Sequence, residues 1–295
     1  KAIRRQRQMC IRDSYIGGEV NSVMKDKNEV EIRFAMCFPD VYEIGMSNLG
    51  MMILYNMFNQ REDVWCERLF SPWPDLDKVM REKKIPLFAL ESQEPIRDFD
   101  FLGITIGYEM CYTNILQVLD LSGIPLKSAD RGEDFPIVIG GGACAYNPEP
   151  LAPFFDLFYI GEGETVYDAL FDAYKANKKA GGSRRDFLLA AAKIPGIYVP
   201  SLYEVTYKED GTIASFAPTE AGVPEKVQKQ LIIDMEKEYR AVEAPVVPHI
   251  KATQDRVTLE IQRGCIRGCR FCQAGMIYRP LRERDVEELK ESARA

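Results

Sequence analysis

Three cysteines near the end of the chain are the residues whose types and spacing most clearly predict chemistry. Cys265, Cys269 and Cys272 stand four and three residues apart. Thiolates at these spacings can converge from one short loop onto one face of a cubane iron–sulfur cluster, which leaves the fourth iron without a protein ligand. An iron with an open coordination position is reactive. The sequence therefore predicts a 4Fe-4S site that activates a further ligand.

Three other interpretations of these cysteines are less favoured. A structural zinc site normally takes four ligands from paired Cys or His units, and the only histidine, His249, lies well upstream. A disulfide framework is typical of short secreted chains, whereas this chain has 295 residues. Buried free cysteines are common, but three within eight residues, beside Gly264 and Gly268, are not a packing pattern.

The pattern Cys-x3-Cys-x-aromatic-Cys resembles the motif of the radical S-adenosylmethionine (SAM) superfamily. The resemblance implies that Cys265, Cys269 and Cys272 ligate a 4Fe-4S cluster and that Phe271 lies near the adenine of SAM. It also implies that the amino and carboxylate groups of SAM occupy the open iron. One electron from the cluster then cleaves the sulfonium to a 5'-deoxyadenosyl radical, so the protein supplies position and shielding.

The residues around the motif predict the first unit of a β/α barrel. Val257–Ile261 has the pattern of a strand that leads into the cysteine loop, and Asp285 with Glu288 resembles a capping box at a helix start. In such barrels the chemistry lies at the carboxyl ends of the strands. Six arginines between Arg263 and Arg284 could offset cluster charge or hold a carboxylate, with ordinary solvated charge as the alternative for each.

Residues 29 to about 180 alternate between strand-like and helix-like patterns, which predicts a doubly wound, mostly parallel α/β sheet. An apolar helix is expected from Leu49 to Met57. The strand candidates are Val30–Met36, Val64–Phe70, Pro86–Leu90, Phe101–Gly107, Pro136–Ile139 and Asp156–Ile160. Ligands of such sheets bind beyond the carboxyl ends of the strands, so the loops at those ends are the candidate binding loops.

Three of these loops are rich in glycine, which lets the backbone approach a bulky ligand, although a generic turn explains any one of them equally well. They are Pro39–Gly45, Gly140–Gly142 and Gly161–Glu164. Together they resemble the cobalamin-binding Rossmann domain that precedes many radical SAM cores. The resemblance assigns cobalamin contacts to Asp40, Tyr42, Gly45, Gly140, Gly141, Gly142, Gly161, Glu162, Gly163 and Glu164.

One position departs from that family. Asp40-x-Tyr42-x-x-Gly45 lies where cobalamin proteins of the methionine synthase type carry Asp-x-His-x-x-Gly. Tyrosine, with a pKa of ~10, is a poor replacement for neutral imidazole as a cobalt ligand. Either cobalamin binds without a lower protein ligand, or the domain keeps its shape without the cofactor.

The chain divides into four expected parts. Arg4–Ser14 is a one-frame translation of a common sequencing-library adapter, so residues 1–14 are treated as non-native. Residues 15–180 form the Rossmann domain, and 181–253 form a connector. Residues 254–295 begin a radical SAM core; a full barrel needs ~200 residues or more, so we expect an incomplete barrel that does not turn over substrate alone.

The connector has its own expected elements. Lys175–Arg185 has the composition of a solvated link, and Phe187–Ile194 predicts a short helix. Leu202–Tyr207 and Thr212–Phe216 predict a hairpin around Asp210-Gly211, and Val227–Ile233 predicts a further strand.

Composition excludes some classes of function. The chain is 46% hydrophobic and 28% charged and has no apolar run that could span a bilayer, so we expect a cytoplasmic protein. A net charge of -7 argues against a broad nucleic-acid surface. The scattered Cys37, Cys66, Cys111 and Cys144 are interpreted as buried reduced thiols.

Residues 15–295 as a whole are similar to an uncharacterised family of radical SAM proteins with a cobalamin-binding domain, in segments such as Tyr15–Glu19, Asn147–Pro150 and Arg270–Gly275. The resemblance implies a radical SAM enzyme with an unassigned substrate and a reductant such as flavodoxin or ferredoxin. The resemblance also suggests that such an enzyme transfers a methyl group through cobalamin. The alternatives are a non-catalytic iron–sulfur or ligand-sensing module and, more weakly, a methylthiotransferase.

Overall fold

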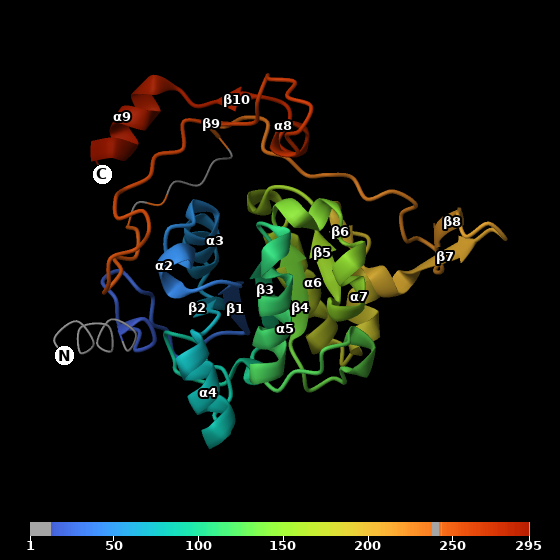
Figure 1. Cartoon of the computed structure of the whole chain (residues 1–295), viewed down its shortest axis with the longest axis horizontal. Helices are drawn as coiled ribbons and strands as arrows, with labels where there is room; N and C mark the ends of the chain where they lie inside the picture. The colour runs from blue at the N-terminus through green and yellow to red at the C-terminus, as the bar shows by residue number, and fades with distance from the viewer. Residues whose placement is uncertain (1–12, 238–241, 243, 295) are drawn as a thin grey trace.

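The computed structural model describes residues 13–237, 242 and 244–294, so most of the adapter-like segment and its Cys10 lie outside the described residues. Its centre is a six-stranded sheet in the order β2-β1-β3-β4-β5-β6 (Figure 1). The first five strands in the chain pair in parallel, and β6 pairs antiparallel with β5. The strands are β1 Ile32–Phe38, β2 Val64–Phe70, β3 Phe101–Thr105, β4 Ile137–Gly141, β5 Leu157–Tyr159 and β6 Ile197–Tyr198.

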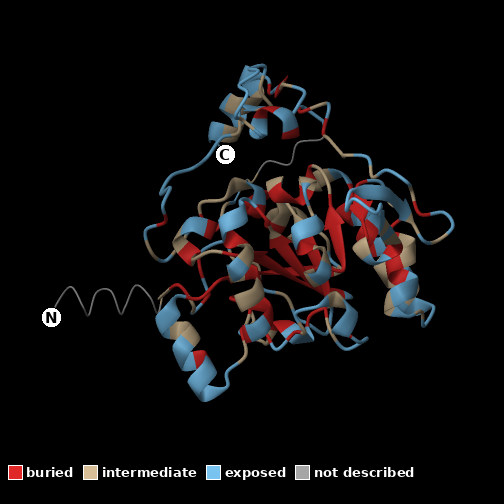
Figure 2. Ribbon diagram, turned by 45° about the vertical axis from the view of Figure 1, so that its right-hand side comes forward, coloured by how far each residue is buried: buried red, intermediate tan, exposed pale blue. Residues whose placement is uncertain are grey.

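Helices cover both faces of this sheet, and Figure 2 shows the strands as a buried layer between them. One face packs on α3 (Leu49–Asn59), α6 (Tyr167–Lys179) and α7 (Arg184–Ala191). The other packs on α4 (Pro74–Lys83) and α5 (Tyr112–Leu121). Every residue of β1 and β2 is therefore buried, as expected for parallel strands that are covered on both sides. The chain is a mixed α/β protein with a parallel sheet.

Aromatic rings form the centre of the core between the sheet and α6. Phe34 of β1 lies 4.9 Å from Phe58 and 5.9 Å from Phe171 between ring centroids, in edge-to-face geometry. Phe101 of β3 continues the cluster toward Tyr174, at 4.6 Å. Such pairs add about 0.5–1.5 kcal/mol each beyond their buried area.

Most of the predicted sheet is confirmed. The strand at Val64–Phe70 forms at the predicted residues. Those at Phe101–Gly107, Pro136–Ile139 and Asp156–Ile160 form with end shifts of one or two residues, and the first strand is displaced to Ile32–Phe38. The strand at Pro86–Leu90 is wrong, because the chain turns back there and makes only an isolated bridge between Phe88 and Pro95.

Three further predictions are corrected by tertiary contacts. Lys175–Lys179 belongs to α6 rather than to a solvated link, because Tyr174 packs that helix against Phe187. Val227–Ile233 is not a strand, since only Gln230 bridges to Gly161. Val257–Ile261 is not a strand either, because no described strand pairs with it, and its two end residues are 74% and 60% exposed.

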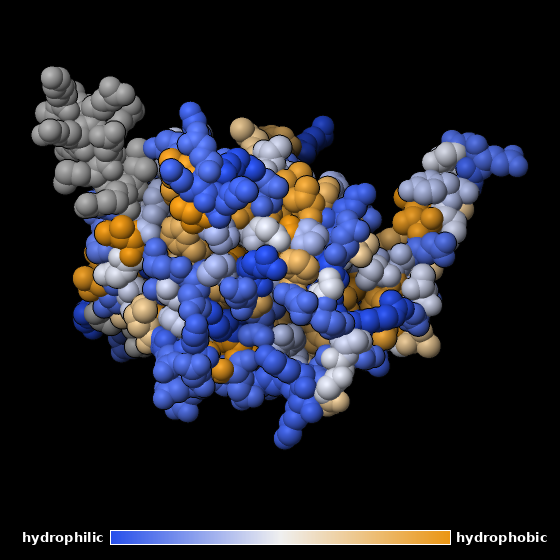
Figure 3. Space-filling model, turned by 90° about the horizontal axis from the view of Figure 1, so that it is seen from below, coloured by the Kyte–Doolittle hydropathy of each residue, from blue (hydrophilic) through white to orange (hydrophobic). Residues whose placement is uncertain are grey.

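The remaining helices and strands lie outside the sheet. They are α2 Tyr42–Gly45, β7 Tyr203–Tyr207, β8 Ile213–Pro218, β9 Gln262–Arg263, α8 Ala274–Ile277, β10 Arg282–Glu283 and α9 Val286–Arg294. The hairpin β7–β8 and α9 confirm their predictions; the Asp285 carboxylate accepts hydrogen bonds from the Glu287 and Glu288 amides at the start of α9. Figure 3, seen from below, shows the hairpin projecting from the molecule.

The sheet continues past residue 180, because β6 joins β5 and α7 packs on the aromatic cluster. The division into domains at that residue stays a prediction. From residue 254 the chain crosses above the carboxyl edge of the sheet, where β9 and β10 form a short antiparallel pair (Figure 1). None of the helices in the described part of the chain has the length and apolar character needed to cross a membrane.

Candidate functional site

A cavity of about 610 Å³ lies between the carboxyl edge of the sheet and the cysteine-bearing segment, which we define as residues 260–284. Sequence-distant parts of the chain line it together. The sheet side contributes Met36, Phe38, Gly103, Ile104, Thr105, Gly107, Tyr108, Gly141, Gly142 and Tyr159, and α3 contributes Leu49, Gly50, Ile53 and Leu54. The cysteine-bearing segment contributes Glu260, Gln262, Arg263, Gly264 and Tyr278.

The strand order explains the place of this cavity. β1 lies between β2 and β3, so the connections after β1 and β3 leave in opposite directions along the sheet. Crevices open at such a switch point, outside the carboxyl ends of parallel strands, and ligands bind there. The sequence predicts a ligand site at this edge, and in the structure the cysteine-bearing segment covers it.

Two of the predicted glycines are required by the backbone. Gly142 has φ +96°, and a Cβ there would lie 2.9 Å from the Ile106 carbonyl oxygen. Gly161 has φ +140°, and its Cβ would lie 2.3 Å from the Gln230 carbonyl oxygen. L side chains rarely adopt such angles, so both glycines shape the loops.

Gly141 has a different role. A Cβ at this position would meet nothing within 4 Å, and the residue lines the cavity. The same is true of Gly107, which the sequence analysis does not assign. These two glycines therefore leave part of the cavity wall as bare backbone. Gly140, in contrast, faces the core, where a Cβ would lie 2.6 Å from the Phe158 ring.

The loop Pro39–Gly45 contributes to the cavity only indirectly. Tyr42 is 1% exposed and does not line the cavity; its hydroxyl donates to Glu19 Oε1 at 2.9 Å. Burial, reinforced by the Glu19 carboxylate, raises the pKa of Tyr42. Gly45 packs against Phe70. Asp40 accepts a hydrogen bond from Tyr108, whose side chain borders the cavity.

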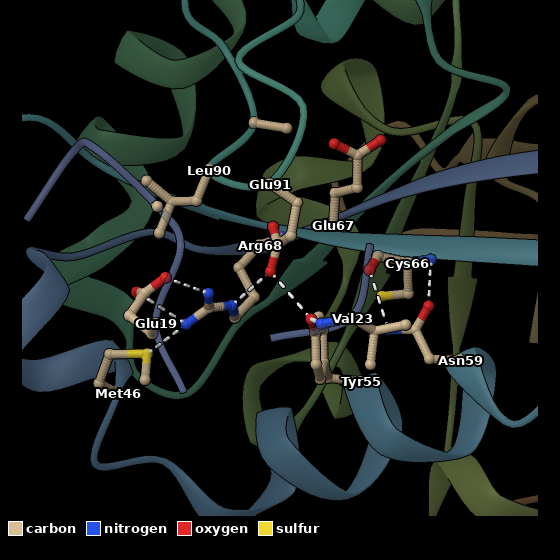
Figure 4. A network of polar contacts seen from close by, with 12 residues as sticks. Glu19, Val23, Met46, Tyr55, Asn59, Cys66, Glu67, Arg68, Leu90 and Glu91 are labelled. Atoms are coloured by element: carbon tan, nitrogen blue, oxygen red, sulfur yellow. Dashed lines mark hydrogen bonds and ion pairs between the residues drawn. The ribbon is translucent and has the colours of Figure 1, made fainter. Parts of the chain in front are cut away.

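Glu19 belongs to a buried ionic network beside the sheet (Figure 4). The Arg68 side chain is 0% exposed and contacts Glu19 Oε2 at 2.8 Å and Glu91 Oε1 at 2.7 Å. The Tyr55 hydroxyl donates to Glu91 at 3.0 Å. The network ties the N-terminal segment to β2 and to the turn after Leu90. The sequence analysis does not predict it.

Glu162 and Glu164, assigned to cobalamin by resemblance, contact the cysteine-bearing segment. Glu162 lies 2.7 Å from Arg282 Nη1 and 3.2 Å from Arg263 Nη1, and Glu164 lies 2.6 Å from Arg263 Nη2. Burial lowers the pKa of Arg263, but hydrogen bonds to Glu260 and Glu164 outweigh burial and leave the pKa above its ordinary value. Both glutamates therefore pair with arginines at the cavity wall.

The three motif cysteines lie on one irregular loop between β9 and α8. Cys269 is exposed, Cys265 and Cys272 are half-buried, and all three are free thiols. Gly264, at φ +89°, turns the chain into this loop, and the Arg267 amide donates to Cys265 Sγ at 3.3 Å. Phe271 is 92% exposed beside them.

This donor set suits a cubane cluster, because each thiolate then binds a separate iron and the sulfurs need not converge on one point. Within the described ranges, no group of three His, Cys, Asp or Glu side chains is placed to hold a single metal ion.

The site residues predicted from the sequence do not include the cavity-lining residues Asn48, Gly107, Tyr108 and Tyr278. Gly107 and Tyr108 follow β3 directly, so the strand-end rule that selected the glycine loops could have found them. Burial raises the pKa of Tyr108, as does its hydrogen bond to Asp40, so it is a neutral hydrogen-bonding group at neutral pH. Tyr278 carries no sequence signal, since it reaches the cavity only through the fold of the cysteine-bearing segment.

Comparison with known proteins gives one family match and one curated relative. The family model described as "Radical SAM proteins, N-terminal" matches residues 50–200. "Uncharacterized protein MJ0966" of Methanocaldococcus jannaschii is 26% identical over 256 residues, which cover 86% of this chain and 44% of the relative. The chain thus spans less than half the length of that relative.

Two solved structures of TsrM, a radical S-adenosylmethionine methyltransferase from Kitasatospora setae, are also similar at low identity. The one with tryptophan substrate and a SAM analogue bound has a TM-score of 0.42 and 15% identity, over 88% of this chain and 44% of that chain. The one with cobalamin and a [4Fe-4S] cluster bound has a TM-score of 0.45 and 13% identity, over 90% and 45%.

Proposed function

Because this chain belongs to the family described as "Radical SAM proteins, N-terminal", we propose that the whole protein is a radical SAM enzyme that binds cobalamin in the cavity at the carboxyl edge of the sheet. When bound, the 4Fe-4S cluster supplies the electron that cleaves SAM to a 5'-deoxyadenosyl radical, and cobalamin supplies a carrier for a methyl group. The observation that carries the proposal is the shared cavity, since the glycine loops Gly140–Gly142 and Gly161–Glu164 and the cysteine-bearing segment line one space.

The chain's own residues have distinct roles in this proposal. Cys265, Cys269 and Cys272 would hold the cluster, and their number leaves one iron for SAM. The exposed ring of Phe271 is free to lie against the adenine. Bare backbone at Gly107 and Gly141 would accommodate a broad, flat ligand. Tyr42 is buried and bonded to Glu19, so cobalamin would bind without a lower ligand from this residue.

The surface of the cysteine loop suits an acidic electron donor such as flavodoxin or ferredoxin. Arg267, Arg270 and Arg279 are exposed around the cysteines. Opposite charges on two proteins accelerate their encounter, most strongly at low ionic strength.

The first prediction is that the whole protein, reconstituted with iron and sulfide without oxygen and then reduced, releases 5'-deoxyadenosine from SAM. The reason is that three thiolates leave one iron for the amino and carboxylate groups of SAM. Chromatography of the quenched reaction measures the product, and the unreduced sample is the control. An intact cluster without any deoxyadenosine would instead support a non-catalytic iron–sulfur module.

The second prediction is that Gly141→Val weakens cobalamin binding about tenfold to a hundredfold, because an overpacked site typically costs ~1–3 kcal/mol. The valine enters the cavity without straining the fold, since its Cβ meets nothing within 4 Å. Absorbance titration with cobalamin measures the affinity of the whole protein.

Two matched variants control this titration. Gly132→Val adds the same side chain at an exposed glycine whose Cβ also meets nothing, and it should leave affinity unchanged. Tyr42→Phe should also retain binding, because its hydroxyl contacts Glu19 and not the cavity. If the folded wild type binds no cobalamin at high micromolar concentration, the proposal of cobalamin-dependent methyl transfer is wrong, whereas the proposal of a radical SAM enzyme is unaffected.

A further inference from the structure

Glu162 collects hydrogen-bond donors from three separate segments of the chain. Its side chain is 8% exposed, on the loop between β5 and α6. Its carboxylate accepts from the Ile232 amide at 3.0 Å, from Arg282 Nη1 at 2.8 Å and from Arg263 Nη1 at 3.2 Å. One side chain on the loop after β5 thus holds the chain on both sides of the cysteine loop.

Neighbouring contacts extend this attachment. Arg263 also bonds Glu164 at 2.6 Å, and Lys229 Nζ donates to the Ile277 and Arg279 carbonyls at 2.9 Å each. We call Glu162, Glu164, Arg263 and Arg282 the clasp. By comparison, the β9–β10 pair that closes the cysteine-bearing segment on itself has only two residues in each strand.

Burial makes the clasp more than a surface ion pair. The side-chain exposures of its four members lie between 5% and 11%. Exposed pairs contribute little, whereas removal of one partner from a buried pair leaves an uncompensated charge and is costly. Arg263 is also part of the cavity wall, together with Glu162 and Glu164.

We propose that Glu162 is a positioning residue that holds the cysteine-bearing segment across the mouth of the cavity. Through the clasp, the binding of a ligand in the cavity and the position of the cysteine loop then influence each other. The ligand half of this inference rests on the proposed function, while the clasp itself does not.

Hydrogen exchange of the ligand-free whole protein tests the clasp. Glu162→Gln removes the charge but keeps the shape, and its amide oxygen still accepts from Ile232. Amides of residues 260–284 should exchange about tenfold faster or more, since hydrogen bonds to charged groups are the strong ones, while amides of β1 and β3 stay unchanged. Glu164→Gln, which loses only the Arg263 contact, should show a smaller effect.

Further variants separate positioning from general stability. Arg282→Met combined with Glu162→Gln should speed exchange by less than the two single effects added together, because both variants lose the Glu162–Arg282 pair. Glu220→Gln, in an exposed pair with Arg185, should change nothing. Unchanged exchange at 260–284 in Glu162→Gln, or equal acceleration in β1 and β3, overturns the inference.

Cobalamin binding tests the coupling. Saturating cobalamin should slow exchange at 260–284 in wild type, and Glu162→Gln should bind it about tenfold more weakly. If wild type binds no cobalamin but the ligand-free exchange result holds, the proposed cofactor fails and the clasp stands. If cobalamin binds equally to both proteins, the coupling fails and the cofactor stands.

Discussion

Replacement of any one of Cys265, Cys269 or Cys272 by alanine is expected to abolish assembly of the iron–sulfur cluster. A cubane held by three thiolates already has one iron without a protein ligand, and a second open iron leaves the cluster without adequate support. Wild type should take up about four irons per chain on anaerobic reconstitution, with the charge-transfer absorption of a cubane, and each variant close to none. Iron and sulfide analysis with absorbance spectroscopy makes the measurement.

Cys66→Ala is the matched control, because this thiol is buried in β2 and should leave iron content unchanged. Full iron content in any of the three loop variants would show that the ligands are assigned wrongly. Stoichiometric zinc in wild type, with no uptake of iron, would show that the three cysteines belong to a zinc site and not to an iron–sulfur cluster.

Arg68→Ala is expected to destabilise the fold by about 3–5 kcal/mol, the usual cost of removing one partner from a buried ion pair. Glu19 and Glu91 would then remain as buried carboxylates without their cation. Because Glu19 also binds Tyr42, the loss should loosen the segment before β1 as well. Urea unfolding, followed by circular dichroism, measures the change.

Arg185→Ala controls for the loss of an arginine. Its side chain is 60% exposed in a surface pair with Glu220, so we expect a change below about 0.5 kcal/mol. Equal unfolding midpoints for the two variants would mean that the Arg68 network does not stabilise this fold.

Local pattern was sufficient for much of the sheet and for the cysteine motif. Val64–Phe70 is a short run rich in β-forming residues, and its strand forms at the predicted residues. The Asp285 cap of α9 depends on neighbours in sequence, and it forms as predicted. The motif Cys265–Cys272 depends on residue types and spacing alone, which is why it predicts cluster chemistry without knowledge of the fold.

Predictions from local sequence were wrong where contacts with residues distant in sequence determine the secondary structure. Val257–Ile261 has strand periodicity, but a strand needs a neighbour to pair its backbone, and the ladder with β10 begins only at Gln262. Lys175–Lys179 has the composition of a solvated link, yet the packing of Tyr174 on Phe101 and Phe187 keeps it helical. Pro86–Leu90 is short and apolar, but its chain reverses before it can join the sheet.

For the candidate site too, some features follow from local sequence and others from the tertiary structure. The sequence by itself determined the cysteine triad and the glycine loops at strand ends, because thiol spacing and the carboxyl-edge rule are local properties. Only the tertiary structure decided that Tyr42 faces Glu19 and that Glu162 and Glu164 bind Arg263 and Arg282. The physical reason is that a buried charge needs a partner, and residues about 100 positions apart become partners only when the fold brings them together.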